Sequence, residues 1–400
     1  MIKYDFTTFM KSIPTTKDYQ KKIEGIKYKL NNDEKMLDWF HLEKCVTTEA
    51  LTKIKELSKT IKEKCDVFVV IGIGGSFLGA KAVIDALSPY FNKGYPEIIF
   101  AGTTISGSYL RDLLEYIKDK KIIINVISKS GTTLEPNIAF EVLYEFMQKK
   151  YSEEELKDRI IITTDKSEGK FRELVNEKGY ENLEIPREIG GRYSVFTAAG
   201  LLPIALAGID IDLLFRGAKE CNIENAFSYA VIRDILYREG KKCESFTIYE
   251  PKLSFFAEWL KQLFGETQGK EKKGILPISV LNTRDLHSLG QYYQDGERIL
   301  FETVISIEKT NDIFIDNKNK SLDEINSIAT NKVAKAHYNG GVYSNIITIN
   351  SLDEETLGHL IYFFEVAAAT GAYLLDVNPF DQPGVNAYKD LINEELNKGE

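Results

Sequence analysis

The sequence is poor in the residues that build disulfide frameworks and metal centres. Its 400 residues include only four cysteines and four histidines. The cysteines show no CxxC spacing, no two histidines have the spacing of metal ligands, and no HExxH motif occurs. We therefore predict no metal site, and we expect the cysteines to be reduced and buried in a cytoplasmic protein. They are Cys45, Cys65, Cys221 and Cys243.

The chain also lacks an excess of positive charge and a hydrophobic run typical of a membrane span. Its 51 basic and 60 acidic residues give a formal net charge of −9, which argues against nucleic acid as the main partner. No secretory segment follows Met1–Asp5. The most apolar helical stretch, Leu360–Ala372, is short for a bilayer and contains Glu365. We expect a core or interface helix there.

Strand-like and helix-like segments alternate in two successive parts of the chain. In the first part, β-branched and aromatic runs predict strands at Val67–Ile71, Glu97–Ala101, Ile122–Ser128, Arg159–Thr164 and Leu183–Ile185. In the second part, the predicted strands are Phe246–Tyr249, Gly274–Val280, Ile299–Ile307 and Ser344–Ile349. The alternation predicts an α/β fold with two doubly wound, mainly parallel sheets. We divide the chain into a helical N-terminal extension (1–64), two α/β domains (65–210 and 211–376) and a C-terminal loop and helix (377–400).

Two of the predicted strands end in loops that suit an anion. The strand Val67–Ile71 runs into a glycine-rich turn, residues 72–76, and then into a helical pattern. Glycines let the backbone approach a ligand, and a new helix turns its free N–H groups outward. The strand that begins at Ile122 ends in residues 128–133, where five of six residues carry a hydroxyl or an amine. Together the loops predict one phosphate group held between them.

Neither loop carries a nucleotide-binding motif. After Gly72 and Gly74, Phe77 replaces the third glycine of the dinucleotide fingerprint, and no acidic residue ends the next strand. The Gly-Lys-Ser/Thr ending of a P-loop is also absent from both. Taken alone, the first loop is explained equally well as a plain connection between a strand and a helix, whereas the second carries more polar side chains than such a turn needs. As a pair they favour a small phosphorylated molecule over NAD or ATP.

Four further segments carry side chains suited to catalysis. They are Gly190–Ser194, Gly265–Lys270, Asp285–Ser288 and Asn378–Gly384, the last of which precedes Lys389. Three of them have a plain alternative: a surface ion pair for Arg192, a solvated carboxylate in a glycine-bounded loop for Glu266, and a helix start capped by Asp285 for His287. The remaining histidines, which we interpret as surface or core residues, are His41, His337 and His359.

Together these segments resemble one family, glucose-6-phosphate isomerase (phosphoglucose isomerase), in its short bacterial form. The matching segments, which occur in the family's order and span most of the chain, are 72–76, 128–133, 190–194, 265–270, 285–288 and 378–382. The family usually has Glu where Asn386 follows Gly384-Val385; we expect this difference to alter the support of Lys389 but not the reaction. The resemblance implies two sugar-isomerase (SIS-type) α/β domains with helical extensions, and no metal or organic cofactor.

The resemblance also implies a role for each matching residue. Glu266 would be the base that moves a proton between C2 and C1 of the sugar, and Arg192 would hold the charge of the enediolate. His287 and Lys389 would open the sugar ring. The implied substrate-binding residues are Gly75, Ser76, Ser128, Lys129, Ser130, Thr133, Gly191, Gln262 and Gln382. A C–H beside a carbonyl is a weak acid, so this chemistry needs both a desolvated carboxylate and a fixed cation.

Two alternative functions and a state of assembly accompany this hypothesis. A bifunctional phosphoglucose/phosphomannose isomerase would use the same residues on a further substrate. A non-catalytic sugar-phosphate-binding SIS module would keep the phosphate loops and lose the base, which the presence of Glu266 argues against.

The resemblance implies a homodimer acting on glucose 6-phosphate and fructose 6-phosphate, with His287 supplied by the neighbouring subunit. We expect the helix at Leu360–Ala372 to offer surface for that interface.

Overall fold

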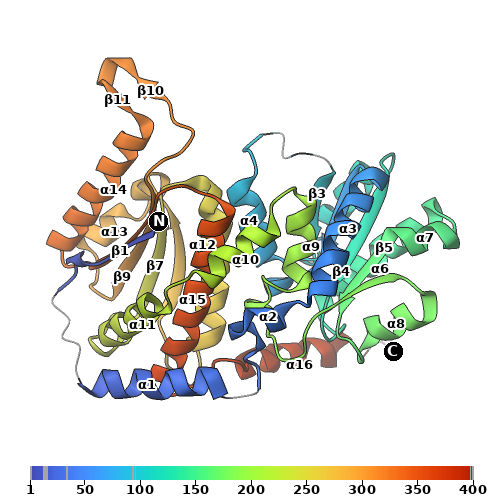
Figure 1. Ribbon diagram of the computed structural model, residues 1–400, viewed down its shortest axis with the longest axis horizontal. Helices are drawn as coiled ribbons and strands as arrows, with labels where there is room; N and C mark the ends of the chain where they lie inside the picture. The colour runs from blue at the N-terminus through green and yellow to red at the C-terminus, as the bar shows by residue number, and fades with distance from the viewer. Residues whose placement is uncertain are drawn as a thin grey trace.

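Two five-stranded sheets organise the chain in the computed structural model, which describes residues 2–11, 17–32, 35–91, 94, 96–396 and 398 (Figure 1). The first sheet has the spatial order β3-β2-β4-β5-β6, and all of its paired strands are parallel. Its strands are β2 (Val67–Ile71), β3 (Glu97–Ala101), β4 (Ile122–Ile127), β5 (Ile160–Thr164) and β6 (Glu181–Glu184).

Strand β2 explains why helices cover both faces of this sheet. All five of its residues are buried, and successive side chains point to opposite faces. Phe68 and Val70 join the main hydrophobic core, whereas Val67, Val69 and Ile71 join a second core. The helices of the first face are α3 (Thr48–Lys64), α4 (Leu78–Leu87) and α9 (Ala198–Leu206). Those of the second are α5 (Gly107–Ile117), α6 (Leu134–Lys150), α7 (Glu153–Arg159) and α8 (Lys170–Lys178).

The second sheet has the order β1-β12-β9-β7-β8 and is parallel except for β1. Its strands are β1 (Ile2–Phe9), β7 (Cys243–Ile248), β8 (Leu276–Leu281), β9 (Leu300–Ile307) and β12 (Ser344–Ile349). The other helices are α1 (Lys17–Asn32), α2 (Leu42–Cys45), α10 (Ile211–Lys219), α11 (Ile223–Arg238), α12 (Ser254–Gln268), α13 (Gly290–Asp295), α14 (Leu322–Asn339), α15 (Glu354–Leu374) and α16 (Asn386–Leu396). A small hairpin, β10 (Phe314–Ile315) and β11 (Lys320–Ser321), precedes α14.

Short 3-10 turns connect several of these elements. They are η1 (Asp38–Phe40), η2 (Gly74–Ser76), η3 (Gly191–Tyr193), η4 (Pro251–Leu253), η5 (Arg284–His287), η6 (Asp316–Lys318) and η7 (Pro383–Val385).

The prediction that residues 1–64 are helical is wrong for β1. Ile2 pairs with Ile349 and Asp5 with Ile346, so β1 extends the edge of the second sheet as an antiparallel strand. Pairing with a strand so far along the chain overrides local preference, which the first residues alone do not reveal. We keep the division of the chain at residues 64, 210 and 376 as a proposal.

Helix α15 is the central core helix between the two sheets. Every residue of Leu360–Ala372 is buried inside the chain, so the expectation that this stretch offers an interface is wrong. The whole helix has 21 residues and fits a membrane span by length and composition. Its burial among the other helices is typical of the core helix of a soluble protein instead.

All four cysteines are free. Cys45 and Cys65 are buried, and burial raises the pKa of both thiols. Cys221 and Cys243 are only partly buried, so the expectation that all four lie in the core is wrong for these two. Free cysteines in such surroundings serve as small apolar residues.

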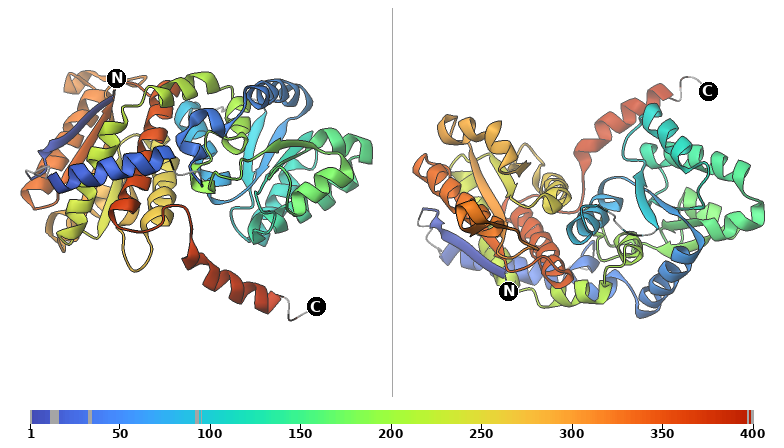
Figure 2. Two further views of the ribbon diagram at one scale, coloured as in Figure 1. Left: turned by 60° about the horizontal axis from the view of Figure 1, so that its bottom comes forward. Right: turned by 90° about the horizontal axis from the view of Figure 1, so that it is seen from above.

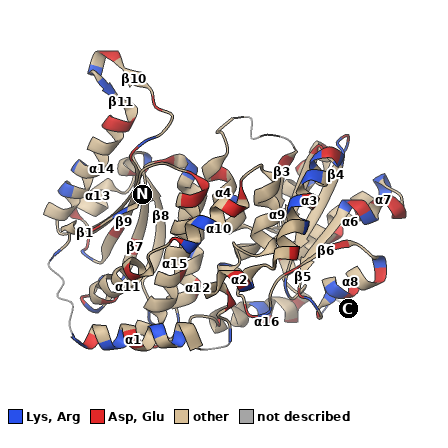
Figure 3. Cartoon of the chain, in the orientation of Figure 1, with Lys and Arg blue, Asp and Glu red and all other residues tan. Residues whose placement is uncertain are grey.

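Charges of both signs are mixed on the outer helices. Figure 3 shows Lys and Arg side by side with Asp and Glu on α1 and α7. In α7 three acidic residues occupy the first turn and Lys157 and Arg159 the last, an order that suits the helix dipole. These charges are explained as solvated helix faces.

The order of the first sheet brings the two predicted phosphate loops together. The chain leaves β2 for β3 on one side and then returns to β4 on the other. Strands β2 and β4 are paired in parallel, with Ile71 beside Val126. The loops that follow them, residues 72–76 and 128–133, therefore start side by side at the carboxyl edge of the sheet, where open α/β sheets bind ligands.

Candidate active site

The first loop makes a turn that only glycine permits. Gly74 has a φ of +57°, and a β-carbon there would lie 2.8 Å from the amide nitrogen of Gln262. A β-carbon on Gly75 would lie 1.8 Å from the carbonyl oxygen of Gly191. These glycines bring the loop against η3 and α12. Ser76 ends the turn and is half-buried.

The second loop is folded by its own hydroxyl groups. The Ser128 hydroxyl accepts a hydrogen bond of 3.1 Å from the N–H of Gly131, and the hydroxyls of Ser130 and Thr132 lie 2.8 Å apart. Thr133 is the N-cap residue of α6, and its side chain makes no capping bond to the helix. The first N–H groups of α6 and the Thr133 hydroxyl are therefore suited to an anion.

Lys129 ties the second loop to the segment before Gly190. Its Nζ donates to the carbonyl oxygens of Arg187 and, at 3.3 Å, of Ile189. Burial lowers the pKa of this lysine. The ammonium group of Lys129 is therefore engaged with this segment.

Arg192 is a buried arginine with a fixed guanidinium group. Its side chain is 3% exposed, so it is not a surface ion pair. Its Nη2 donates to the carbonyl oxygens of Pro379 at 2.7 Å and Asp381 at 3.0 Å. Its Nη1 donates to Gln382 Oε1 at 3.2 Å and to Glu266 Oε2 at 2.9 Å. The arginine therefore presents a permanent positive charge to Glu266 in a low-dielectric setting.

Glu266 lies on the last turn of α12 and not in the loop that the sequence predicts. The helix continues through Gly265, because the N–H of Gly269 still bonds to the carbonyl oxygen of Gly265 at 3.0 Å. Glu266 Oε1 accepts a 3.0 Å hydrogen bond from Gln262, one helical turn earlier. With Arg192 on its other oxygen, the carboxylate is held by two donors, and its side chain remains 32% exposed.

Gln262 also offers a buried acceptor. Its Oε1 is buried and has no hydrogen-bond partner among the residues that the structure describes. An unsatisfied buried carbonyl costs free energy, and a hydroxyl group of a bound molecule removes that cost. This acceptor, one helical turn from Glu266, therefore suits a hydroxyl group of a ligand.

The structure does not bring His287 to Glu266. His287 is exposed at the end of η5, and within the described part of the chain its imidazole has no hydrogen bond. The predicted cap is also wrong: Asp285 lies inside the turn and accepts a 2.8 Å bond from the N–H of Leu281. The turn begins before the predicted helix start, which moves Asp285 out of the capping position.

Lys389 also lies apart from Glu266. It is exposed on α16, a helix with no buried residue among those described. Figure 2 shows α16 extending away from the rest of the chain. A single chain in this conformation therefore assembles the two predicted phosphate loops, Arg192, Glu266, Gln262 and Gln382, but not the two groups predicted to open the ring.

The phosphoglucose isomerase family model matches residues 47–278 and 302–399. This chain belongs to the phosphoglucose isomerase family. A glucose-6-phosphate isomerase from Caldanaerobacter subterraneus is 48% identical over 381 residues, 88% of this chain and 84% of that protein. A second one, from Fusobacterium nucleatum, is 47% identical over 398 residues, 92% of this chain and 89% of that protein.

Solved structures of similar fold support the predicted architecture. A hypothetical protein from Thermus thermophilus has a TM-score of 0.88 at 25% identity, covering 99% of this chain and 100% of that one. A glucose-6-phosphate isomerase from Chlamydia trachomatis has a TM-score of 0.74 at 22% identity, covering 87% and 73%. The predicted family and the two-sheet α/β fold class are confirmed.

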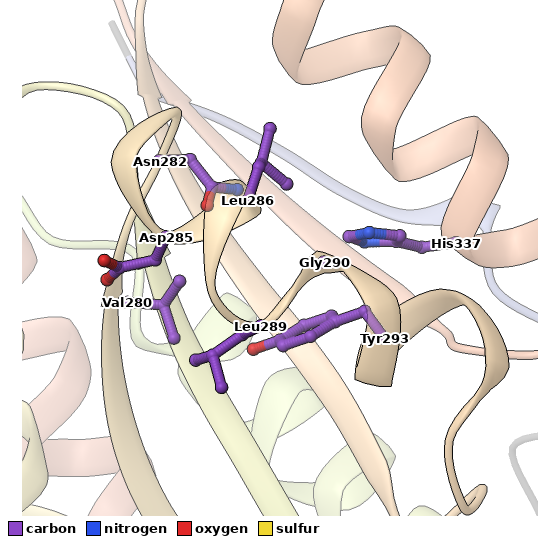
Figure 4. A pocket seen from close by; sticks show the side chains of 8 residues that line it. All are labelled: Val280, Asn282, Asp285, Leu286, Leu289, Gly290, Tyr293 and His337. Carbon is purple, nitrogen blue, oxygen red and sulfur yellow. The ribbon is translucent and has the colours of Figure 1, made fainter.

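Two hollows lie away from Arg192 and Glu266. The pocket in Figure 4, beside η5, includes Asp285, Tyr293 and His337 and has no room for a water molecule. A cavity of about 970 Å³ lies between α1, α11 and the end of β1. Neither contains a predicted site residue.

Within the described ranges, no group of three His, Cys, Asp or Glu side chains is placed to hold a metal ion.

Lys270 is a site residue to which the sequence assigned no role. Its Nζ donates to the carbonyl oxygen of Asn378 and, at 2.9 Å, to Asp381 Oδ1, and its side chain is 7% exposed. Burial lowers the pKa of Lys270. It thereby fixes the loop whose carbonyl groups hold Arg192. Its place in the 265–270 segment was a signal, but its partners lie more than a hundred residues away.

Proposed function

We propose that this member of the phosphoglucose isomerase family interconverts glucose 6-phosphate and fructose 6-phosphate, with Glu266 as the base. The observation that carries the proposal is the 2.9 Å contact between Glu266 and the buried Arg192. A carboxylate for the proton and a fixed cation for the developing charge are the two groups that an aldose–ketose isomerisation requires side by side.

The reaction then follows from these two groups. Glu266 takes the proton from C2 of the open-chain aldose, and the electron pair forms a C1–C2 double bond while the carbonyl oxygen at C1 gains negative charge. Arg192 stabilises that charge in the cis-enediolate. Transfer of the hydroxyl proton at O2 to O1 and return of a proton from Glu266 to C1 give the ketose. No atom is gained or lost, and the carboxylate is restored.

The phosphate group of the substrate is bound between the first and second loops in this proposal. Gly75, Ser76, Ser128, Lys129, Ser130 and Thr133 form this cradle. Support comes from the pairing of β2 with β4, which starts both loops at one edge, and from the free N-terminus of α6. The sugar side is lined by Gly191, Gln262 and Gln382. Gln262 donates a hydrogen bond to Glu266, and Gln382 accepts one from Arg192.

Ring opening needs a separate acid and base, for which we propose His287 and Lys389. Both are exposed in a single chain. The proposal therefore includes a homodimer in which His287 reaches the site of the neighbouring subunit, and a movement of α16 that brings Lys389 to its site. A cytoplasmic location is proposed from the free cysteines.

The non-catalytic alternative is disfavoured by the site itself. A module that only binds sugar phosphate needs no carboxylate held between an amide and a buried arginine, and Glu266 is held in that way. A bifunctional phosphoglucose/phosphomannose isomerase would use the same base on the C2 epimer. Incubation with mannose 6-phosphate separates that activity from the proposed one.

Proton NMR in D2O tests the proposal directly. Glucose 6-phosphate, fructose 6-phosphate and mannose 6-phosphate are each incubated with pure protein, and we expect only the first two to interconvert, with deuterium entering at C2 or C1. Glu266→Gln should lower turnover by about 10²–10⁴-fold or more while substrate still binds. Glu258→Gln, on the same helix, is the matched control and should keep its activity. Near-normal turnover of Glu266→Gln would remove Glu266 from the mechanism.

A further inference from the structure

The residues that follow Arg192 and Glu266 are also bonded to each other. The hydroxyl groups of Tyr193 and Thr267 lie 3.2 Å apart, and either can donate the hydrogen bond. Tyr193 is 1% exposed and Thr267 is fully buried. Two contacts therefore connect turn η3 to helix α12. One is the Arg192–Glu266 ion pair at the partly exposed Glu266, and the other is the buried Tyr193–Thr267 hydrogen bond.

The ring of Tyr193 is fixed on two sides. It stacks on Trp39, with ring centroids 4.4 Å apart and an interplanar angle of 23°. It also meets the edge of Phe380 at 5.9 Å. Phe380 stands between Pro379 and Asp381, whose carbonyl groups hold Arg192. Burial raises the pKa of Tyr193, so its hydroxyl group stays protonated.

We expect the ion pair and the hydrogen bond between η3 and α12 to respond differently to a bound substrate. In the proposed reaction the fixed charge of Arg192 is shared with the enediolate oxygen, and Glu266 faces the carbon that loses its proton. Their mutual contact therefore weakens during the reaction. The Tyr193–Thr267 bond lies in the core, out of reach of the substrate, and remains intact.

We propose that the Tyr193–Thr267 hydrogen bond sets the separation of Arg192 from Glu266 during proton transfer, which makes Tyr193 and Thr267 positioning residues. This inference rests on the proposed role of Glu266 as the base. A small displacement of a base from the C–H that it attacks costs rate without weakening the binding of a phosphate group held elsewhere. The bond should therefore affect kcat and not KM.

Tyr193→Phe and Thr267→Val test the inference because each removes one hydroxyl group and keeps most of the packing. We expect kcat to fall about 5–50-fold in each, with KM within about twofold of normal. With glucose 6-phosphate deuterated at C2, the isotope effect on kcat should rise, since proton transfer becomes slower. Thr267→Ser keeps a hydroxyl group and should stay close to the unmodified protein.

The double variant and one control distinguish a positioning role from a general loss of stability. If the bond is the shared cause, the double variant is no slower than the slower single variant. Tyr362→Phe removes another buried hydroxyl, which donates to the Phe40 carbonyl at 2.7 Å; it should lower the melting temperature and leave kcat unchanged. Additive losses, or a normal kcat in Tyr193→Phe, would overturn the inference. Glu266→Gln is assayed in parallel, so that an active Glu266→Gln variant identifies a failure of the base assignment instead.

Discussion

The backbones of Gly75 and Gly191 are in contact, and the Ser194 hydroxyl group bridges their carbonyl oxygens. The Ser194 hydroxyl lies 2.7 Å from the carbonyl oxygen of Gly191 and 3.4 Å from that of Gly75. The first predicted phosphate loop and the turn that carries Arg192 are thus held in one position relative to each other. The contact leaves no room for a side chain at residue 75, since a β-carbon would fall 1.8 Å from the Gly191 oxygen.

Gly75→Ala should therefore separate the two loops. Backbone on both sides has to shift, so we expect kcat/KM to fall by about 10²-fold and the melting temperature to drop as well. Steady-state kinetics and thermal unfolding measure the two effects. Gly107→Ala is the control, because a β-carbon there meets nothing within 4 Å. Normal kinetics in Gly75→Ala would contradict the contact.

Thr133→Ala tests the phosphate loop. The variant removes one neutral donor at the start of α6, so KM should rise about 3–10-fold while kcat changes little. Thr52→Ala serves as the control, since its hydroxyl group donates to the Thr48 carbonyl oxygen within α3. An unchanged KM with a collapsed kcat would mean that this loop acts in the chemistry and not in phosphate binding.

We expect Glu365 to make the stability of the protein depend on pH. It is fully buried, its two oxygens have no partner among the described residues, and burial raises its pKa well above the ordinary 4.5. Above pH 4.5 the unfolded chain releases this proton while the folded chain keeps it. The folded state then binds more protons, so the free energy of unfolding falls as pH rises from that value towards the raised pKa.

Urea unfolding at several pH values between about 5 and about 8 measures this dependence. Glu365→Gln has no proton to release, so its free energy of unfolding should fall less steeply with pH than that of the unmodified protein. Glu63→Gln, at an exposed position, should leave the slope as it is. Parallel curves for the unmodified protein and Glu365→Gln would show that Glu365 is ionised in the folded state.

A hybrid dimer tests whether His287 acts across subunits. Glu266→Gln and His287→Ala subunits are each expected to be nearly inactive as homodimers. If the histidine is donated to the neighbour, one site of the hybrid combines both intact residues and the other combines both substitutions. About half of the unmodified activity per dimer should return, because one of two symmetric sites is complete.

If His287 serves its own chain instead, each hybrid site carries one substitution and activity stays low. Tagging the two subunits differently allows the hybrid to be purified before assay. The position of His287 makes the test informative: it is exposed, and the family match stops at residue 278 and resumes at 302, on either side of it.

The sequence predicts most of the fold because continuous apolar runs mark most of the strands. Val67–Ile71 is buried at every position, and such runs identify the strands of a parallel sheet without knowledge of their partners. Strand β1 escapes this logic, since only its pairing with β12 makes it a strand. The sequence predicts too early an end for helix α12, because Gly265 suggests a break, although a helix tolerates one glycine at a cost of about 1 kcal/mol.

The site was predictable in its residues but not in its connections. The segment after the last predicted strand of the first sheet identifies Arg192, and the glycine-bounded segment 265–270 identifies Glu266. The hydrogen bonds that hold them come from Pro379 and Asp381, and the stacking on Tyr193 comes from Trp39. These are contacts between distant parts of the chain, in which backbone carbonyl groups and aromatic rings leave no distinctive spacing in the sequence.

The pairing of β1 with β12 has a consequence for how the protein is made. Strand β12 lies between β9 and β1 in the finished sheet, yet β1 is synthesised first and has to wait until residues 344–349 leave the ribosome. A fragment that lacks residues 2–9 would expose β12 as an open edge, a ready template for association with other chains. Expression of the second half alone should therefore yield aggregates, and a co-expressed or fused copy of the β1 segment should restore solubility.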